Sequence, residues 1–228
     1  MIVTTYNTEI KTKTDIYCSV DYFMFKNIAA KRKSLIITDK NVFELYSNDF
    51  SKLNCIIIES GENSKNLKNI ENIVNQLIEY DIDRNSLIIG FGGGVVCDIA
   101  GFVASTYMRG IPFGFVATTL LAQIDAAIGG KNGINFGNYK NYIGNINQPL
   151  FVINDATFLK TLSDNDYLSG IGEVLKYCFI STDNLIDYFV SNFASVLERD
   201  KDIMDYIVRK CIKIKTDMES FQGHSAVG

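Results

Sequence analysis

Histidine, proline and tryptophan are scarce in this sequence: its 228 residues include one histidine, two prolines and no tryptophan. Because His224 is the single histidine, the chain alone cannot complete a mechanism or metal site that needs two or more imidazoles. The five cysteines are scattered, odd in number and never in a C-x-x-C pair, which argues against a disulfide framework and a thiolate zinc site. We expect most of them to be small buried apolar residues.

Strong charge of one sign is also absent. The formal net charge is −4, with acidic and basic residues interspersed, so the chain lacks the electrostatic signature of a nucleic-acid-binding protein. No apolar run reaches the roughly 18 residues that a membrane span requires, and the N-terminus does not resemble a secretory leader. We therefore expect a globular cytoplasmic protein that binds neither nucleic acid nor membranes. Its 47% hydrophobic residues suffice for a sizeable core.

The sequence does contain a regular alternation of short strands and helices. Runs rich in β-branched residues predict buried strands at 34–39, 55–59, 86–90, 114–119 and 150–155. Apolar residues three and four positions apart predict a helix over 64–80, with Ser64 as its cap, and another helix is expected over 95–104. Strands that alternate with helices indicate a parallel sheet wrapped by helices.

The strand signal ends near residue 156. Beyond it, residues 165–180, 183–198 and 203–218 each predict a helix. We therefore expect an α/β nucleotide-binding domain with a Rossmann-like parallel sheet over residues 1–156, followed by the start of an all-helical domain over residues 157–228.

Three consecutive glycines, Gly92, Gly93 and Gly94, follow one predicted strand. At the carboxyl edge of a parallel sheet, such a turn lets backbone N–H groups and a helix N-terminus reach phosphate. The spacing is not the G-x-G-x-x-G fingerprint, and a glycine turn alone is as often a turn without a ligand. Charged and polar residues around it, costly to bury without a partner, together indicate an anion site: Asp98, Arg109, Thr118, Thr119, Asp125, Lys131, Lys140 and Asn141.

Four segments carry a resemblance to a known family. They are GGGVVCDIAGFVASTYMRG at 92–110, TTLLAQIDAAIGGKNGIN at 118–135, YKNYIG at 139–144 and GIGEVLKY at 170–177. In order and spacing they closely resemble the 3-dehydroquinate synthase family. The resemblance implies an enzyme dependent on NAD and a divalent metal that converts 3-deoxy-arabino-heptulosonate 7-phosphate to 3-dehydroquinate and phosphate. It implies transient oxidation by NAD, phosphate elimination, re-reduction and aldol closure, on the shikimate pathway, and usually a homodimer.

The same resemblance implies roles for individual residues. It places NAD against Asp39, Asn41, Glu62, Lys65, Gly93, Gly94, Val95, Asp98, Thr118, Thr119, Lys140, Phe158, Leu159, Lys160 and Thr161. It places the substrate against Arg109, Asp125, Lys131, Asn141 and Lys176. The residues that it implies for catalysis are Lys131, Asn141, Lys176 and Lys215. A phosphorylated sugar acid carries several negative charges, which fixed cations and bidentate donors suit.

A divalent metal, zinc or cobalt, is the second cofactor that the resemblance implies. Glu173 matches the family's carboxylate ligand, and a helix places it on the same face as Lys176. In the family two histidines join this glutamate, whereas this chain offers only His224, so Glu173 and His224 are the candidate ligands. The chain resembles the first two-thirds of the enzyme, with its helical domain incomplete. We expect it to be inactive or weakly active as it stands.

Departures from the family pattern leave alternatives open. At four positions the chain differs from residues that many family members carry: Ala126, Ala127, Asn132 and Phe136. Related sugar phosphate cyclases therefore remain an alternative. Arg109, Lys131 and Asn141 favour a carboxylate-bearing substrate. A glycerol-dehydrogenase-like NAD oxidoreductase would produce net NADH from a polyol. A non-catalytic paralogue that only binds nucleotide would lack metal.

Overall fold

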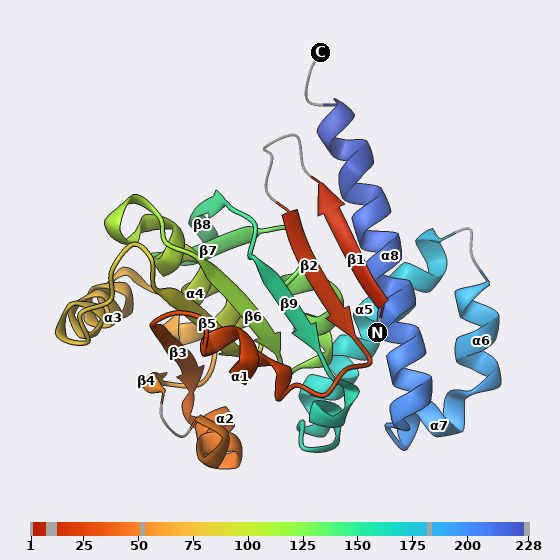
Figure 1. Ribbon diagram of the computed structural model, residues 1–228. Helices are drawn as coiled ribbons and strands as arrows, with labels where there is room; N and C mark the ends of the chain where they lie inside the picture. The colour runs from red at the N-terminus through yellow and green to blue at the C-terminus, as the bar shows by residue number, and fades with distance from the viewer. Residues whose placement is uncertain (1, 8–12, 51–52, 182–183, 226–228) are drawn as a thin grey trace.

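The computed structural model describes residues 2–7, 13–50, 53–181 and 184–225 of the chain, with side chains over 13–50, 53–181 and 184–218. At its centre lies a seven-stranded sheet with the order β1-β2-β9-β6-β5-β3-β4 (Figure 1). Its strands are β1 (Ile2–Asn7), β2 (Lys13–Cys18), β3 (Ser34–Asp39), β4 (Asn54–Ile58), β5 (Leu87–Gly92), β6 (Phe113–Ala117) and β9 (Phe151–Asn154).

The sheet is parallel except at one edge, where β1 pairs antiparallel with β2. All five predicted strands are confirmed, as β3, β4, β5, β6 and β9, with small shifts at their ends. Sequence reasoning missed β1 and β2. In β2 the side chains alternate between buried positions and exposed or half-buried ones, so no continuous apolar run marks the strand.

Helices cover both faces of the sheet. Within β3, Ile36 joins a cluster with Phe25 and Phe91 on one face, whereas Leu35 and Ile37 join the cluster on the other. The first face is covered by α1 (Met24–Ala29) and α2 (Lys40–Tyr46), and the second by α3 (Leu67–Glu79) and α4 (Gly94–Thr106). Burial on both faces explains why the central strands read as unbroken apolar runs.

The predicted cap of α3 is wrong. The N-cap is Asn66, whose side-chain oxygen accepts a hydrogen bond from the Asn69 amide at 2.9 Å. Ser64 instead ends a short 3-10 turn, η2 (Glu62–Ser64), and its hydroxyl donates to the Glu59 carbonyl. The helix therefore begins later than its apolar spacing suggests, because residues 62–64 form a separate turn and Lys65 lies between that turn and the N-cap.

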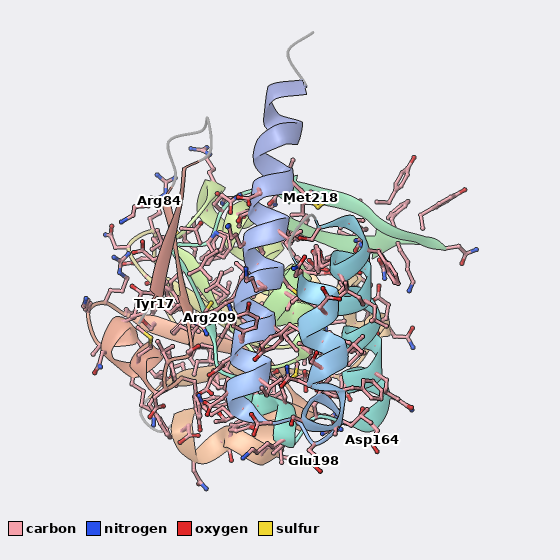
Figure 2. The ribbon with its side chains drawn as sticks, turned by 90° about the vertical axis from the view of Figure 1, so that its right-hand side faces the viewer. Tyr17, Arg84, Asp164, Glu198, Arg209 and Met218 are labelled. Atoms are coloured by element: carbon pink, nitrogen blue, oxygen red, sulfur yellow. The ribbon has the colours of Figure 1, made fainter. Side chains whose placement is uncertain are left out.

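The last part of the chain is helical. It contains α5 (Asp164–Ile180), α6 (Leu185–Ser191), α7 (Phe193–Leu197) and α8 (Lys201–Ser225). The predicted helix 183–198 is two helices, because Asn192 leaves helical geometry between them. Helix α8 contacts β2 and each of the other three helices, and in the view of Figure 2 it lies between the N-terminal strands and those helices. One apolar cluster runs from Ile16 on the sheet to Cys211 on α8. The predicted domain boundary near residue 156 stays a prediction.

A separate two-stranded antiparallel ribbon, β7 (Lys131–Phe136) and β8 (Tyr139–Ile146), was not predicted. It packs on α4, where Gly101 leaves no room for a side chain: an added Cβ would lie 1.8 Å from the Asn132 Oδ1. The Asn132 amide is fixed in place by the carbonyls of Gly130 and Asn147. No helix within the described part of the chain is both long and apolar enough to cross a membrane.

Candidate active site

Most of the residues predicted to bind the nucleotide lie at or near the carboxyl ends of the parallel strands, the side of the sheet that we call the nucleotide edge. In the sheet, β3 pairs with β4 on one side and with β5 on the other, and β6 and β9 follow beyond β5. The direction in which successive strands are added therefore reverses between β3 and β5. Asp39 ends β3, and Gly93 comes directly after β5. Ligands of open α/β sheets bind at the carboxyl ends of strands beside this reversal.

The glycine turn brings backbone, rather than side chains, to this edge. Gly93 is the N-cap of α4, a helix of 13 residues whose first N–H groups have no intrahelical partner. A Cβ on Gly92 would lie 2.6 Å from Val96 Cγ2, and one on Gly93 would lie 2.8 Å from Thr119 Cγ2. The closed turn and the partial positive charge of the helix N-terminus fit the pyrophosphate of a dinucleotide.

The other predicted nucleotide contacts near this edge differ in exposure and in the hydrogen bonds that they already make. Asp39 caps α2, accepting hydrogen bonds from the Val42 amide at 3.0 Å and from the Ser60 hydroxyl at 3.2 Å. Phe158 and Leu159, in the 3-10 turn η5 (Ala156–Lys160), are 1% and 0% exposed, so only their backbone can meet a cofactor. Asn41, Lys160 and Thr161 are exposed and Val95 is half-buried.

Lys65 forms a buried polar cluster between α4 and the ribbon. Its side chain is 4% exposed, and its Nζ lies 2.5 Å from Asp98 Oδ2 and 2.5 Å from Asn141 Oδ1. Burial raises the pKa of the Asp98 carboxyl, and the charge and hydrogen bond of Lys65 only partly offset this. The structure thus joins two predicted nucleotide contacts to Asn141, a predicted substrate contact.

Beside this cluster lies a pocket of about 620 Å³, within the usual size of ligand sites. Five predicted site residues line it: Asp98, Asp125, Lys131, Asn141 and Lys215. Other polar residues in its lining are Asn132, Tyr142 and Asn145. Asp125 enters from a π-helical turn, η4 (Ala122–Ala126), a distortion that is frequent at functional sites. The structure therefore gathers residues that are up to 117 positions apart, from 98 to 215.

The Asp125 carboxylate is held by two partners on the helical side. Lys215 Nζ on α8 lies 2.5 Å from Asp125 Oδ1, and the Tyr177 hydroxyl on α5 donates to the same oxygen at 3.1 Å. Burial acts to raise the pKa of Asp125, but the hydrogen bond and charge of Lys215 outweigh it, and the pKa lies below its usual 3.8. Burial and the neighbouring Asp125 both raise the pKa of Tyr177, which stays protonated.

Glu173 and Lys176 contact each other on α5, with Lys176 Nζ 2.6 Å from Glu173 Oε1. The bond to Glu173 raises the pKa of Lys176, and Lys176 contributes to lowering that of Asp125. No group of three metal-binding side chains occurs among the residues whose placement is described. His224 falls in α8, but its side chain lies outside the described residues. The described residues therefore do not fit a three-ligand metal centre, and we derive no step through one.

Of the predicted substrate contacts, Arg109 and Lys176 do not line the pocket, and neither do Glu173 and Lys140. Arg109 is exposed in a turn, η3 (Tyr107–Arg109), at the opposite end of α4 from the glycine turn, and its backbone φ is +69°. Lys140 is exposed on β8. Their roles stay predictions.

Sequence reasoning overlooked two polar residues that organise the site. Tyr177 follows Lys176 directly and contacts Asp125, a pairing across 52 positions that spacing does not reveal. Asn135 lies in β7 and contacts Glu62, Lys65 and Asn141. A signal for Asn135 was its place between Lys131 and Asn141 in a stretch rich in glycine and asparagine.

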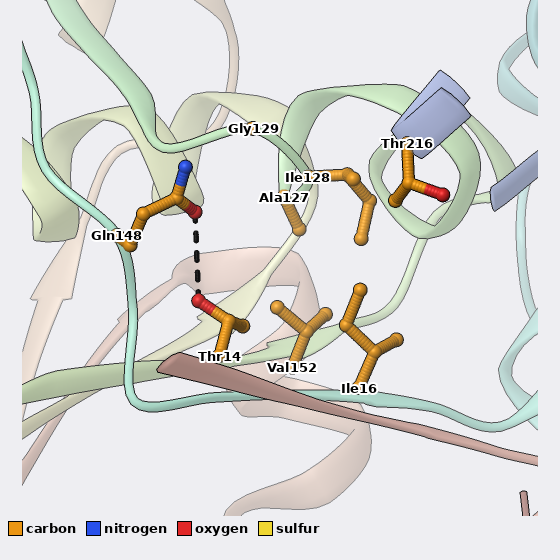
Figure 3. A pocket seen from close by; sticks show the side chains of 8 residues that line it. All are labelled: Thr14, Ile16, Ala127, Ile128, Gly129, Gln148, Val152 and Thr216. Atoms are coloured by element: carbon orange, nitrogen blue, oxygen red, sulfur yellow. Dashed lines mark hydrogen bonds between the residues drawn. The ribbon is translucent and has the colours of Figure 1, made fainter. Parts of the chain in front are cut away.

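A second cavity, between the sheet and α8, has about 10 Å³, room for roughly one water (Figure 3). Apolar side chains such as Ile16, Ile128 and Val152 line much of it, and Thr14 donates to Gln148 Oε1 at 3.5 Å on one side. It is too small for a cofactor or a sugar phosphate, so the 620 Å³ pocket is the candidate active site.

The sheet order and the turn at its reversal point define a Rossmann-like α/β protein. The profile of the family described as 3-dehydroquinate synthase N-terminal matches residues 55–169, which is half of the chain. The chain belongs to this family.

Individual relatives agree with this membership. The 3-dehydroquinate synthase of Alkaliphilus metalliredigens (strain QYMF) is 39% identical over 201 residues, covering 86% of this chain and 56% of the relative. The chain thus spans about half the length of the curated relatives that it matches.

Two solved structures share the fold. A 2-epi-5-epi-valiolone synthase from Streptomyces hygroscopicus subsp. jinggangensis 5008, with NAD+ and Zn2+ bound, superposes with a TM-score of 0.81 and 24% identity. The match covers 92% of this chain and 61% of that one. A 2-deoxy-scyllo-inosose synthase complexed with carbaglucose-6-phosphate, NAD+ and Co2+ superposes with a TM-score of 0.81 and 21% identity. That match covers 96% of this chain and 64% of the other.

Proposed function

We propose that this chain carries the NAD site and most of the substrate pocket of a 3-dehydroquinate synthase. The reaction would convert 3-deoxy-arabino-heptulosonate 7-phosphate to 3-dehydroquinate and phosphate. Relatives near 40% identity with this activity support the proposal. The observation that carries it is the juxtaposition of a glycine turn at the strand reversal with a pocket lined by Lys131, Asn141 and Lys215.

The charges of the pocket suit a phosphorylated sugar acid. Lys131 and Lys215 line it, and Lys176 is near enough to Asp125 to affect its titration. The ammonium groups of Lys131 and Lys215 in the lining, with that of Lys176 nearby, would bind a phosphate and a carboxylate at once. Asp125, kept ionised by Lys215, and the amide of Asn141 would accept and donate hydrogen bonds to the hydroxyls.

NAD is the cofactor that the glycine turn fits, and when bound it would supply reversible hydride transfer at a substrate alcohol. Two structures with the same fold hold NAD+ together with zinc or cobalt, which supports a dependence on a divalent metal. Glu173 is the metal ligand that the family resemblance offers here. The buried Asp98–Lys65 pair would exclude water between the nucleotide edge and the pocket, because both groups are already paired and largely buried.

The test is phosphate release from the heptulosonate phosphate by the chain with NAD and zinc or cobalt, against a chelated sample. In parallel, NAD binding is titrated calorimetrically. Chelator-sensitive release that fails in Lys131→Met would establish the function. NAD binding without release would leave a nucleotide-binding chain that does not catalyse the reaction alone. Net NADH from a simple polyol would support the glycerol-dehydrogenase-like alternative and overturn the proposal.

Two further properties stay predictions from the sequence. A homodimer is testable by light scattering of the chain at several concentrations. A cytoplasmic location is testable by fractionation of cells that express it.

A further inference from the structure

Asn135 links three parts of the site through three hydrogen bonds. Its backbone amide donates to the Lys65 carbonyl at 2.8 Å. Its side-chain Nδ2 donates to Glu62 Oε1 at 2.9 Å, and its Oδ1 accepts from the Asn141 amide at 2.8 Å. The first two partners belong to the turn η2 and the residue after it, and the third belongs to β8.

A break in the ribbon frees Asn135 to make these bonds. The pairing of β7 with β8 shifts between Ile134 and Phe136, so Asn135 has no partner in the ladder there. Such bulges re-aim a residue and are frequent beside active sites. Asn141, opposite, has a backbone φ of +52°, a conformation that asparagine tolerates better than most residues.

Side-chain contacts of Lys65 and Glu62 add to the link between residues 62–65 and β8. Lys65 Nζ reaches across to Asn141 Oδ1 at 2.5 Å, while the Asn135 amide group holds Glu62. Glu62 and Lys65 belong to the predicted nucleotide contacts, and Asn141 lines the pocket. Residues 62–65 and strand β8 are thus tied at two points, and the backbone of Asn141 cannot shift without disturbing Asn135.

We propose that Asn135 is a positioning residue that couples the nucleotide edge to the substrate pocket. The inference rests on the proposed function, because it takes NAD as the ligand of the turn η2. NAD that fixes Glu62 and Lys65 thereby also fixes Asn135, and through it the β7–β8 ribbon around Asn141. Coupling of this kind is reciprocal, so a substrate that orders the ribbon strengthens NAD binding by the same factor.

The experiment is amide hydrogen exchange of the chain with and without saturating NAD, read at the β8 amides around Asn141. NAD is expected to slow this exchange at least about fivefold in the native chain, at the lower end of typical coupling. In Asn135→Ala only the Lys65–Asn141 bond still joins the two parts through side chains, so the slowing should fall to about twofold at full NAD occupancy. The matched control is Asn138→Ala, in the exposed turn of the same ribbon, which should behave like the native chain.

A second variant keeps the test independent of ribbon stability. Asn135→Asp retains the acceptor for the Asn141 amide but faces Glu62 with a carboxylate in place of a donor. It should keep the NAD-free protection of the ribbon and lose most of the further slowing by NAD. If Asn135→Ala or Asn135→Asp binds NAD and the ribbon still slows as in the native chain, the inference is wrong. NAD binding that leaves the native ribbon unchanged also overturns it. Failure of the native chain to bind NAD overturns the proposed function, and this inference with it.

Discussion

The nucleotide edge and the substrate pocket are neighbours built in different ways. At the nucleotide edge, backbone and small residues dominate: a Cβ on Gly92 or Gly93 would collide with Val96 or Thr119. In and beside the pocket, charged side chains from distant elements hold one another, as in the Lys65–Asp98 and Lys215–Asp125 pairs, each at 2.5 Å. The first region is fixed by shape and the second by charge.

This difference determines what each region tolerates. Added volume should damage the nucleotide edge at any pH, because packed atoms cannot move apart cheaply. Loss of charge should damage the pocket in a pH-dependent way, because its carboxylates titrate. The predictions below test this contrast, beginning with the largest expected effect.

Lys65→Met should cause the largest loss of stability, about 3 kcal/mol at neutral pH, because it leaves the Asp98 carboxylate buried without its cation. Burial already raises the pKa of Asp98, and without Lys65 that pKa rises further. A carboxyl whose folded pKa lies above its unfolded value stabilises in acid, and the contribution falls as the pH rises. The loss in Lys65→Met should therefore be small near about pH 4 and grow toward neutrality, as measured by urea unfolding at several pH values.

The double variant Lys65→Met with Asp98→Asn provides the control. It removes both charges, so most of the lost free energy of unfolding should return and the pH dependence should flatten. A double variant no more stable than Lys65→Met would contradict the view that charge holds this region.

Gly93→Ala should act through shape, with a smaller effect. Its Cβ would lie 2.8 Å from Thr119 Cγ2 and would also occupy the surface that the pyrophosphate approaches. We expect the Kd for NAD to rise about tenfold, equivalent to about 1.4 kcal/mol, with the same ratio from pH 5 to pH 8. Titration calorimetry at several pH values measures this directly.

A companion variant separates the two consequences of that methyl group. Thr119→Ser removes the Cγ2 atom, so Gly93→Ala combined with Thr119→Ser should recover stability but not NAD affinity. Recovery of NAD affinity as well would mean that the Thr119 contact, and not backbone approach by the cofactor, requires glycine here.

The same contrast explains what sequence reasoning could predict. The nucleotide edge is local: the glycine turn follows its strand directly, so the strand, the turn and helix α4 were all identified. The parallel sheet was equally readable, because strands buried on both faces form continuous apolar runs. The predicted cap at Ser64 failed because the residues between the strand and the helix form a separate turn.

The pocket is not local, and its partners were harder to foresee. The pairing of Asp125 with Lys215 spans 90 positions and depends on a π-helical turn that has no simple sequence signature. The β7–β8 ribbon combines glycine, asparagine and a bulge, all of which weaken a strand pattern. The family resemblance named Asp125 and Lys215 as separate contacts, but only the fold shows that they contact each other.

Lys215→Met should have the smallest effect, about 1 kcal/mol at neutral pH, because Asp125 is 37% exposed and solvent screens the pair. The pKa of Asp125 lies below 3.8, so its contribution to stability is present above that pH and is lost as the pH falls through the folded pKa. Native chain and variant should therefore converge in acid. The matched control is Lys40→Met, whose pair with Glu59 is also 2.5 Å long but exposed on both sides, and which should cost less than about 0.5 kcal/mol. Equal losses in the two variants would show that burial adds nothing to the Lys215 pair, and the pocket would then be held by packing, like the nucleotide edge.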